Sequence, residues 1–191
     1  MTQTENFQTR QYRRNLDQTD QDHLDLPTCV ISSTPEETFS LGVTLAKMLK
    51  KGSIVALKGA LGAGKTCLAK GIARGLCVKE ELTSPTYTII SEYRGTLPEG
   101  KAPQTENSAG KNESNICLYH IDAYRLGGND DFSAIGGEEV IFGDGISIIE
   151  WSERIPGFIP DDAIRVDIDI NENQKRLINI YREATPQGNV K

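Results

Sequence analysis

The sequence predicts an α/β protein in which a mainly parallel sheet is flanked by helices and carries antiparallel strands at its edges. Three observations lead to this fold class. A short apolar run at 53–58 leads into a glycine-rich loop at 59–66, which opens an amphipathic helix at 67–76. Two later apolar runs, 115–122 and 145–151, each carry an acid at or near their end. Finally, the last forty residues contain a period-two pattern that is typical of a hairpin.

The length of 191 residues predicts one domain with a sizeable core. We place this domain at residues 28–183. Residues 1–27 are rich in Gln, Thr, Asp and Arg without an apolar period, which predicts a disordered tail, and residues 184–191 are expected to fray. A stretch dominated by Gly, Pro, Asn, Ser and Lys predicts a flexible insert at about 94–115.

Composition limits the partners and the location of the protein. The net charge is −6 and the isoelectric point is near 5.0, so RNA contact would need a local patch or a partner protein. No apolar stretch approaches the ~18 residues needed to span a bilayer. We therefore expect a cytoplasmic protein without a membrane partner. The cysteines show neither C-x-x-C spacing nor pairing with histidine, which argues against zinc and predicts reduced thiols at Cys29, Cys67, Cys77 and Cys117.

The first predicted elements are a strand and a helix. Residues 28–32 have the apolar, β-branched character of a short strand. Ser33 or Thr34 then caps a helix that has Pro35 in its first turn and a glutamate placed to complete a capping box. We expect Lys50-Lys51-Gly52 to close this helix.

The glycine-rich loop fits the pattern G-x-x-x-x-G-K-[ST] of a phosphate-binding Walker A loop. Its glycines permit positive φ and leave no Cβ between the backbone N–H groups and a phosphate. The positive end of the following helix favours the same anion. Lys65 supplies charge for the β- and γ-phosphates, and the Thr66 hydroxyl can bind Mg²⁺. The loop predicts a nucleoside triphosphate held by Gly59, Leu61, Gly62, Ala63, Gly64, Lys65, Thr66 and Cys67.

Hydroxyl side chains gather at 83–88, one helix after this loop, and a strand is expected at 89–93. Switch segments that sense a γ-phosphate usually occupy this place, which makes Thr86 a candidate. A polar loop fixed by Pro85 is the alternative interpretation.

Two acids follow predicted buried strands, where open α/β sheets bind ligands. Asp122 is a candidate for the Mg²⁺ shell or its waters. Glu150 ends a hydrophobic strand as a Walker B acid does. Arg125 is placed to pair with phosphate or a glutamate, and His120 shares a face with Asp122 but is interpreted as a buried, hydrogen-bonded histidine rather than a base. Trp151 is expected to pack at the sheet edge, with a binding role left open.

Short helices are predicted around 132–135 and 138–142 within an acidic, glycine-broken segment at 127–145. Alternation at 163–170 and again at 176–181, across a polar turn, predicts an antiparallel hairpin.

Three motifs together resemble one family: the loop with its preceding Leu57-Lys58, Ser-Pro-Thr-Tyr at 84–87, and His-Ile-Asp-Ala-Tyr-Arg-Leu at 120–126 combined with Ile-Glu-Trp at 149–151. In this order they resemble the TsaE (YjeE) family over about residues 28–182. Ala60 and Cys67 depart from the residues that are usual there.

The resemblance implies an ATPase that supports threonylcarbamoyladenosine formation at position 37 of tRNA. It implies TsaD and TsaB as partners, and tRNA as an indirect partner through their complex. ATP and Mg²⁺ are the implied cofactors. The implied site residues are Gly62, Gly64, Lys65 and Thr66 for phosphates and metal, with Lys65, Thr86, Asp122 and Glu150 as the catalytic set and Thr66, Asp122 and Glu150 around Mg²⁺.

Other P-loop functions remain open from the residues alone. A small-molecule or nucleotide kinase would share the architecture, although its usual arginine-rich lid is not evident in the scattered Arg94, Arg125, Arg154 and Arg165. A GTPase is disfavoured because no N-K-x-D guanine motif occurs. A nucleotide-gated scaffold without significant hydrolysis is the non-enzymatic alternative.

Overall fold

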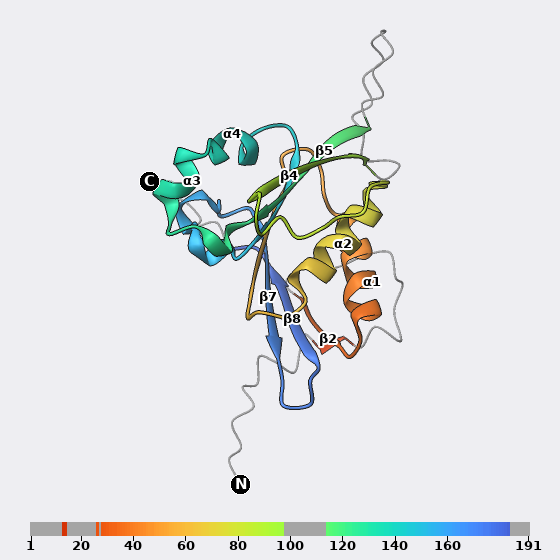
Figure 1. The fold of residues 1–191 in the computed structure, drawn as a ribbon. Coiled ribbons are helices and arrows are strands. Elements are labelled where there is room, and N and C mark those ends of the chain that lie inside the picture. The colour runs from red at the N-terminus through yellow and green to blue at the C-terminus, as the bar shows by residue number, and fades with distance from the viewer. Residues whose placement is uncertain (1–12, 15–25, 27, 98–113, 184–191) are drawn as a thin grey trace, which may run out of the picture.

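The computed structural model describes residues 13–14, 26, 28–97 and 114–183, which form an eight-stranded sheet with helices on both faces (Figure 1). The order across the sheet is β1-β2-β8-β7-β3-β6-β5-β4. The strands are β1 (Arg13–Arg14), β2 (Thr28–Ser32), β3 (Ile54–Gly59), β4 (Ile90–Thr96), β5 (Asn115–Asp122), β6 (Ile146–Glu150), β7 (Ile164–Ile170) and β8 (Arg176–Tyr181).

The centre of the sheet is parallel, because β3 pairs in parallel with both β6 and β7, and β5 pairs in parallel with β6. The antiparallel strands lie outside this centre: β4 beside β5, and β8 between β7 and β2. This arrangement confirms the predicted fold class, including the hairpin of β7 and β8.

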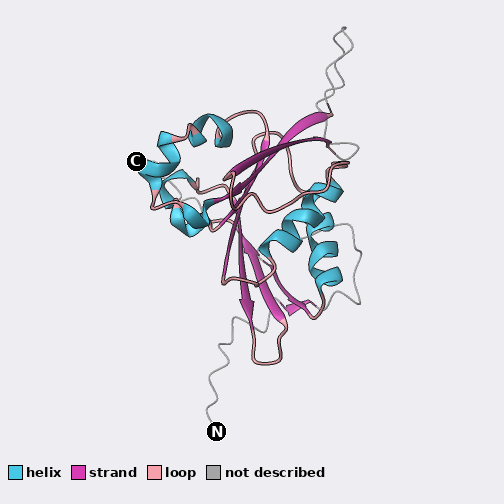
Figure 2. Ribbon diagram, viewed as in Figure 1, coloured by secondary structure: helices cyan, strands magenta, loops and turns pink. Residues whose placement is uncertain are grey.

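The helices form two layers, seen on opposite sides of the sheet in Figure 1 and in cyan in Figure 2. One layer contains α1 (Pro35–Ala46) and α2 (Lys65–Gly75); the other contains α3 (Asn129–Ala134) and α4 (Gly137–Ile141). Three 3₁₀ turns complete the described elements: η1 (Ala123–Arg125), η2 (Ser152–Arg154) and η3 (Pro156–Phe158).

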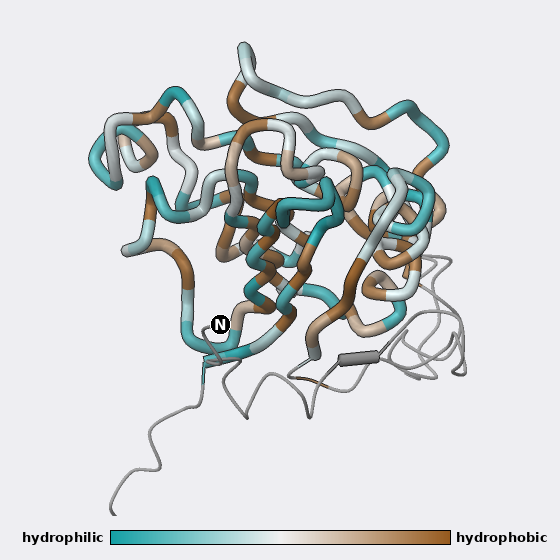
Figure 3. The backbone as a smooth tube through the Cα atoms, turned by 90° about the horizontal axis from the view of Figure 1, so that it is seen from below, coloured by the Kyte–Doolittle hydropathy of each residue, from teal (hydrophilic) through white to brown (hydrophobic). Residues whose placement is uncertain are grey.

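Each helix layer covers its own hydrophobic core. Leu68 and Ile72 of α2 pack in one cluster with Ile148 of β6, whereas Phe132 of α3 belongs to a second cluster with Ile149 of the same strand. Neighbouring strand residues point to opposite faces, so β6 contributes to both cores. In Figure 3, hydrophobic stretches gather in the interior of the fold, and the outer segments are more mixed in hydropathy.

Helix α1 begins as predicted. Thr34 is the N-cap residue, and its hydroxyl accepts a hydrogen bond of 3.1 Å from the Glu37 amide. The Glu37 carboxylate reaches back to the Ser33 amide, at 2.5 Å. These reciprocal bonds satisfy amide groups that have no carbonyl partner inside the helix.

The predicted end of α1 at Lys50-Lys51-Gly52 is wrong, because the helix ends at Ala46. The amides of residues 47–49 bond to carbonyls three residues earlier rather than four, which tightens the last turn out of α-helical geometry. This turn still buries Leu49 completely, so the apolar pattern continued past the end of the helix.

Glycines bring α1 and α2 together. A Cβ on Gly71 of α2 would collide with the Phe39 carbonyl of α1, and a Cβ on Gly42 of α1 would collide with the Leu68 carbonyl of α2. This close approach packs α1 directly against α2, the helix that follows the glycine-rich loop.

The predicted insert is narrower at both ends than expected, since β4 extends to Thr96 and β5 begins at Asn115. Most of the predicted N-terminal tail, residues 98–113 of the insert and residues 184–191 lie outside the described residues. Within the described parts of the chain, no helix is long and apolar enough to cross a membrane.

Candidate nucleotide-binding site

The glycine-rich loop connects β3 to α2 at the carboxyl end of the parallel strands. Gly62 has φ of 77° and Gly64 has φ of 112°, a region of backbone conformation that favours glycine. Gly64 is the N-cap residue of α2, and no side chain caps the helix there. The amide groups of the first turn of this 11-residue helix are therefore suited to an external anion such as phosphate.

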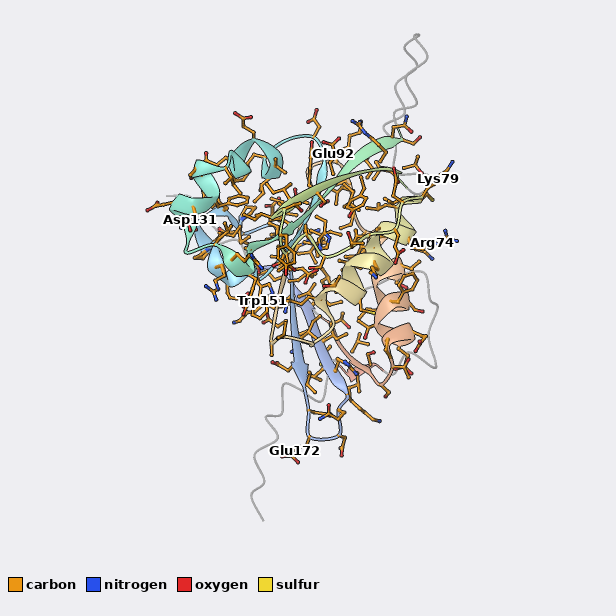
Figure 4. The ribbon with its side chains drawn as sticks, in the orientation of Figure 1. Arg74, Lys79, Glu92, Asp131, Trp151 and Glu172 are labelled. Carbon is orange, nitrogen blue, oxygen red and sulfur yellow. The ribbon has the colours of Figure 1, made fainter. Side chains whose placement is uncertain are left out.

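Lys65 is folded back over the loop. Its Nζ donates to the carbonyl oxygens of Gly59 at 2.8 Å and Ala60 at 3.0 Å, and lies 3.7 Å from the centre of the Trp151 ring. Burial lowers the pKa of Lys65 below its usual value, while Glu150 is the strongest of the nearby acids that oppose this shift. The position of Trp151 is labelled in Figure 4. Phosphate would offer this ammonium group a stronger partner than two carbonyls and an aromatic ring.

Thr66, Glu150 and His120 form a continuous chain of hydrogen bonds. The Thr66 hydroxyl donates to Oε2 of Glu150 at 2.9 Å, and Oε1 of Glu150 lies 2.8 Å from Nε2 of His120. The Glu150 residue is only 3% exposed. Both oxygens of this buried carboxylate are thus held, one by the P-loop and the other by strand β5.

Asp122 holds the segment between α2 and β4. Its Oδ2 accepts hydrogen bonds from Thr86 at 2.8 Å and Ser84 at 3.0 Å, and these two hydroxyls lie 2.7 Å apart. Its Oδ1 accepts from the backbone amide of Tyr124 at 3.0 Å. The predicted switch-like segment is therefore tied directly to the acid at the end of β5.

Sheet register explains why the two acids are neighbours. Asp122 and Glu150 are paired residues of β5 and β6, and Glu150 is also paired with Leu57 of β3. Because β3, β5 and β6 run parallel, their carboxyl ends meet at one edge, where the loop after β3 also lies. The structure thus brings together Lys65, Thr66, Thr86, Asp122 and Glu150, although their roles in binding and catalysis stay predictions.

The remaining candidates lie around this group with different exposures. Ala63 is fully buried, whereas Leu61 is 81% exposed. Cys67 turns away from the loop. Its thiol donates to the carbonyl oxygen of Pro35, the first residue of α1, at 3.1 Å. Only the backbone of Cys67 is therefore positioned toward the loop. Arg125 lies over the Tyr87 ring, at 4.3 Å, rather than against a glutamate.

The oxygen donors fit Mg²⁺ better than a softer metal. Thr66, Glu150 and Asp122 offer a hydroxyl and two carboxylates, which are hard ligands. Among the described residues, no group of three or more His, Cys, Asp or Glu side chains is placed to hold a metal ion.

The sequence did not predict two contacts of the site. The period of two had placed His120 and Asp122 on one face, but it did not show that His120 contacts Glu150. No spacing in the sequence indicates the contact between Lys65 and Trp151, a residue that lies directly after β6 and has a φ of 60°.

The parallel central sheet, the strand–loop–helix unit and the acids at one edge define a protein of the P-loop NTPase-like α/β class. A family model, threonylcarbamoyl adenosine biosynthesis protein TsaE, matches residues 32–178. The chain belongs to the TsaE family, whose role is in tRNA threonylcarbamoyladenosine biosynthesis.

Individual relatives agree with this assignment. The tRNA threonylcarbamoyladenosine biosynthesis protein TsaE of Treponema pallidum is 35% identical over 150 residues, covering 78% of this chain and 97% of that protein. The protein of the same name from Bacillus subtilis is 35% identical over 152 residues, covering 79% of each. Among solved structures, Bacillus subtilis YdiB is similar with a TM-score of 0.59 at 28% identity, covering 85% of this chain and 89% of that one.

Proposed function

We propose that this protein is a Mg²⁺-dependent ATPase that supports threonylcarbamoyladenosine formation at position 37 of tRNA together with TsaD and TsaB. One observation carries the proposal: the 2.9 Å hydrogen bond between Thr66 and Glu150. It puts the hydroxyl of the P-loop beside the acid of a neighbouring strand, the pair of groups that holds Mg²⁺ in P-loop NTPases.

The side chains divide the work of hydrolysis between them. Lys65 leaves its two carbonyl partners and pairs with the phosphate oxygens of ATP. Glu150 orients the attacking water and accepts its proton as the bond between the γ-phosphorus and the leaving oxygen breaks. Thr66, Glu150 and Asp122 are the residues that would hold Mg²⁺ or its waters, and the ion would supply positive charge to the phosphate oxygens.

Thr86 is the residue through which the loop before β4 responds to the γ-phosphate. Its hydroxyl shares Oδ2 of Asp122 with Ser84. A γ-phosphate, or a metal ion bound to it, that interacts with Asp122 would change the hydrogen bonds from Thr86 and Ser84. It would therefore change the conformation of the loop before β4. Such coupling is typical of switch segments.

Partner proteins act at the same edge of the sheet. Three exposed side chains on the loops there, Leu61, Tyr87 and Tyr124, offer apolar contact area. A partner docked over them excludes water from the site and supplies contacts that the isolated chain lacks. We therefore expect slow hydrolysis by the protein alone, with tRNA reached through TsaD and TsaB. The cytoplasm is the proposed location.

The test is phosphate release from ATP by the protein alone, with TsaD, with TsaB and with both, using Lys65→Ala as the control. We expect stimulation by the partners that is lost in the variant. Rapid turnover that is indifferent to the partners, or transfer of phosphate to a small acceptor, would favour a kinase. ATP-dependent partner binding without phosphate release would favour the scaffold. Competition between ATP and GTP tests base preference.

A further inference from the structure

We propose that His120 is a positioning residue for Glu150: it fixes the carboxylate through one oxygen so that the other stays beside the P-loop threonine. The inference rests on the proposed function and adds a residue to that site. It is carried by the contact between Nε2 of His120 and Oε1 of Glu150, at 2.8 Å.

The surroundings of His120 decide which ring nitrogen carries the proton. The side chain is fully buried, and its Nδ1 has no hydrogen-bond partner among the described residues. A proton on Nδ1 would leave a buried N–H group without an acceptor, which is costly. If Nε2 carried no proton, its lone pair would face a lone pair of Oε1 of Glu150, and the two would repel each other. The geometry therefore assigns the neutral tautomer with the proton on Nε2, donating to Glu150.

This bond matters because a glutamate side chain is otherwise flexible. Three rotatable bonds separate the Glu150 carboxylate from the backbone, and a carboxylate held at one oxygen only can still swing. Here His120 holds Oε1 and Thr66 holds Oε2, so both the position and the plane of the group are set before substrate arrives. A preorganised base does not lose this freedom again during the reaction.

The contact also joins two strands at the site. His120 is paired with Ile148 of β6, and Glu150 lies two residues further along the same face of that strand. Leu118, two residues before His120, is fully buried in the core beneath α2. An apolar side chain at position 120 would thus find apolar neighbours, and packing alone does not call for a histidine here.

The variants separate positioning from packing. His120→Leu introduces an apolar side chain of similar size that cannot donate a hydrogen bond, whereas His120→Gln carries an amide that can donate to Oε1 of Glu150. Ser147→Ala is the matched control, because it removes from the opposite face of β6 a buried hydroxyl that has no hydrogen-bond partner among the described residues. Each is compared with the wild type for melting temperature, kcat and KM for ATP in the presence of TsaD and TsaB.

We expect His120→Leu to lower kcat about 10- to 100-fold, the usual effect of removing a group that orients a site residue. Its KM for ATP should change by less than about twofold, because the phosphate-binding loop is untouched. His120→Gln should recover most of kcat, and Ser147→Ala should behave as the wild type. A His120→Leu protein with wild-type kcat, or equal losses in the leucine and glutamine variants, would overturn the proposal.

A measurement on the wild type tests the inference even if the variants do not fold. Correlation of ring protons with ¹⁵N in the NMR spectrum shows which imidazole nitrogen is protonated. The chain has two histidines, and their signals are told apart by individual substitution. We expect a protonated Nε2 and a bare Nδ1 for His120; a bare Nε2 would refute it. Failure of the ATPase proposal would instead show as an inactive wild type with this tautomer still present.

Discussion

Replacing Glu150 with glutamine tests the proposed chemistry with little change in structure. The glutamine oxygen can accept from His120, and its amide can donate to the Thr66 hydroxyl, whose bond simply reverses direction. Both existing contacts, at 2.8 and 2.9 Å, are therefore retained. We expect the free energy of unfolding to change by less than about 1 kcal/mol, the net value of one ordinary hydrogen bond.

The effect on hydrolysis should be much larger, because an amide cannot accept the proton of the attacking water. A positioned general base contributes about 10²- to 10⁴-fold, which corresponds to roughly 3–5 kcal/mol of activation free energy. ATP affinity should stay within about threefold, or roughly 0.7 kcal/mol, because Lys65 and the loop amides are unchanged. Glu150→Ala should also bind ATP and fail to hydrolyse it.

The assay is single-turnover phosphate release with TsaD and TsaB, together with calorimetric titration of ATP and denaturant unfolding of each variant. Wild-type turnover in either Glu150→Gln or Glu150→Ala would refute the role given to this acid. Loss of ATP binding in Glu150→Gln would show instead that the carboxylate serves mainly to hold metal and nucleotide.

Three further predictions concern other parts of the molecule. Lys65→Ala should abolish measurable ATP binding in the same titration while the protein stays folded, and retained affinity would count against the loop as the phosphate site. Gly71→Ala should lower the free energy of unfolding by about 2 kcal/mol, since its methyl group would collide with the Phe39 carbonyl and this strain exceeds the gain in helix propensity; an unchanged urea midpoint would contradict the close packing of α1 on α2. A hydrogen bond with Cys117, followed by burial, raises the pKa of Tyr119 from 10.0 to about 12. Because the folded state holds this proton more tightly, the associated stability is present below pH 10 and is lost as the pH rises from 10 to about 12. NMR titration of labelled tyrosine should show this value, and Cys117→Ala should return it toward 10; an ordinary pKa in the wild type would refute the interaction.

The sequence by itself predicted the order and type of most elements. The strands at 28–32 and 115–122, the helix after the glycine-rich loop and the terminal hairpin have the predicted type and place. These features are local, since a period of two or of 3.6 residues and a capping threonine act within one segment. The end of α1 was mispredicted because Leu49 stays buried after the helical hydrogen bonds have tightened.

The sequence also identified the acids and the phosphate-binding loop, because short motifs carry that chemistry. What it did not determine was which side chains meet. Glu150 lies between Thr66 and His120, which are 84 and 30 residues away, and only the pairing of β6 with β3 and β5 brings the three together. The geometry of the site thus depends on strand order and register, which arise from packing the whole sheet between its two helix layers and not from any single stretch of residues.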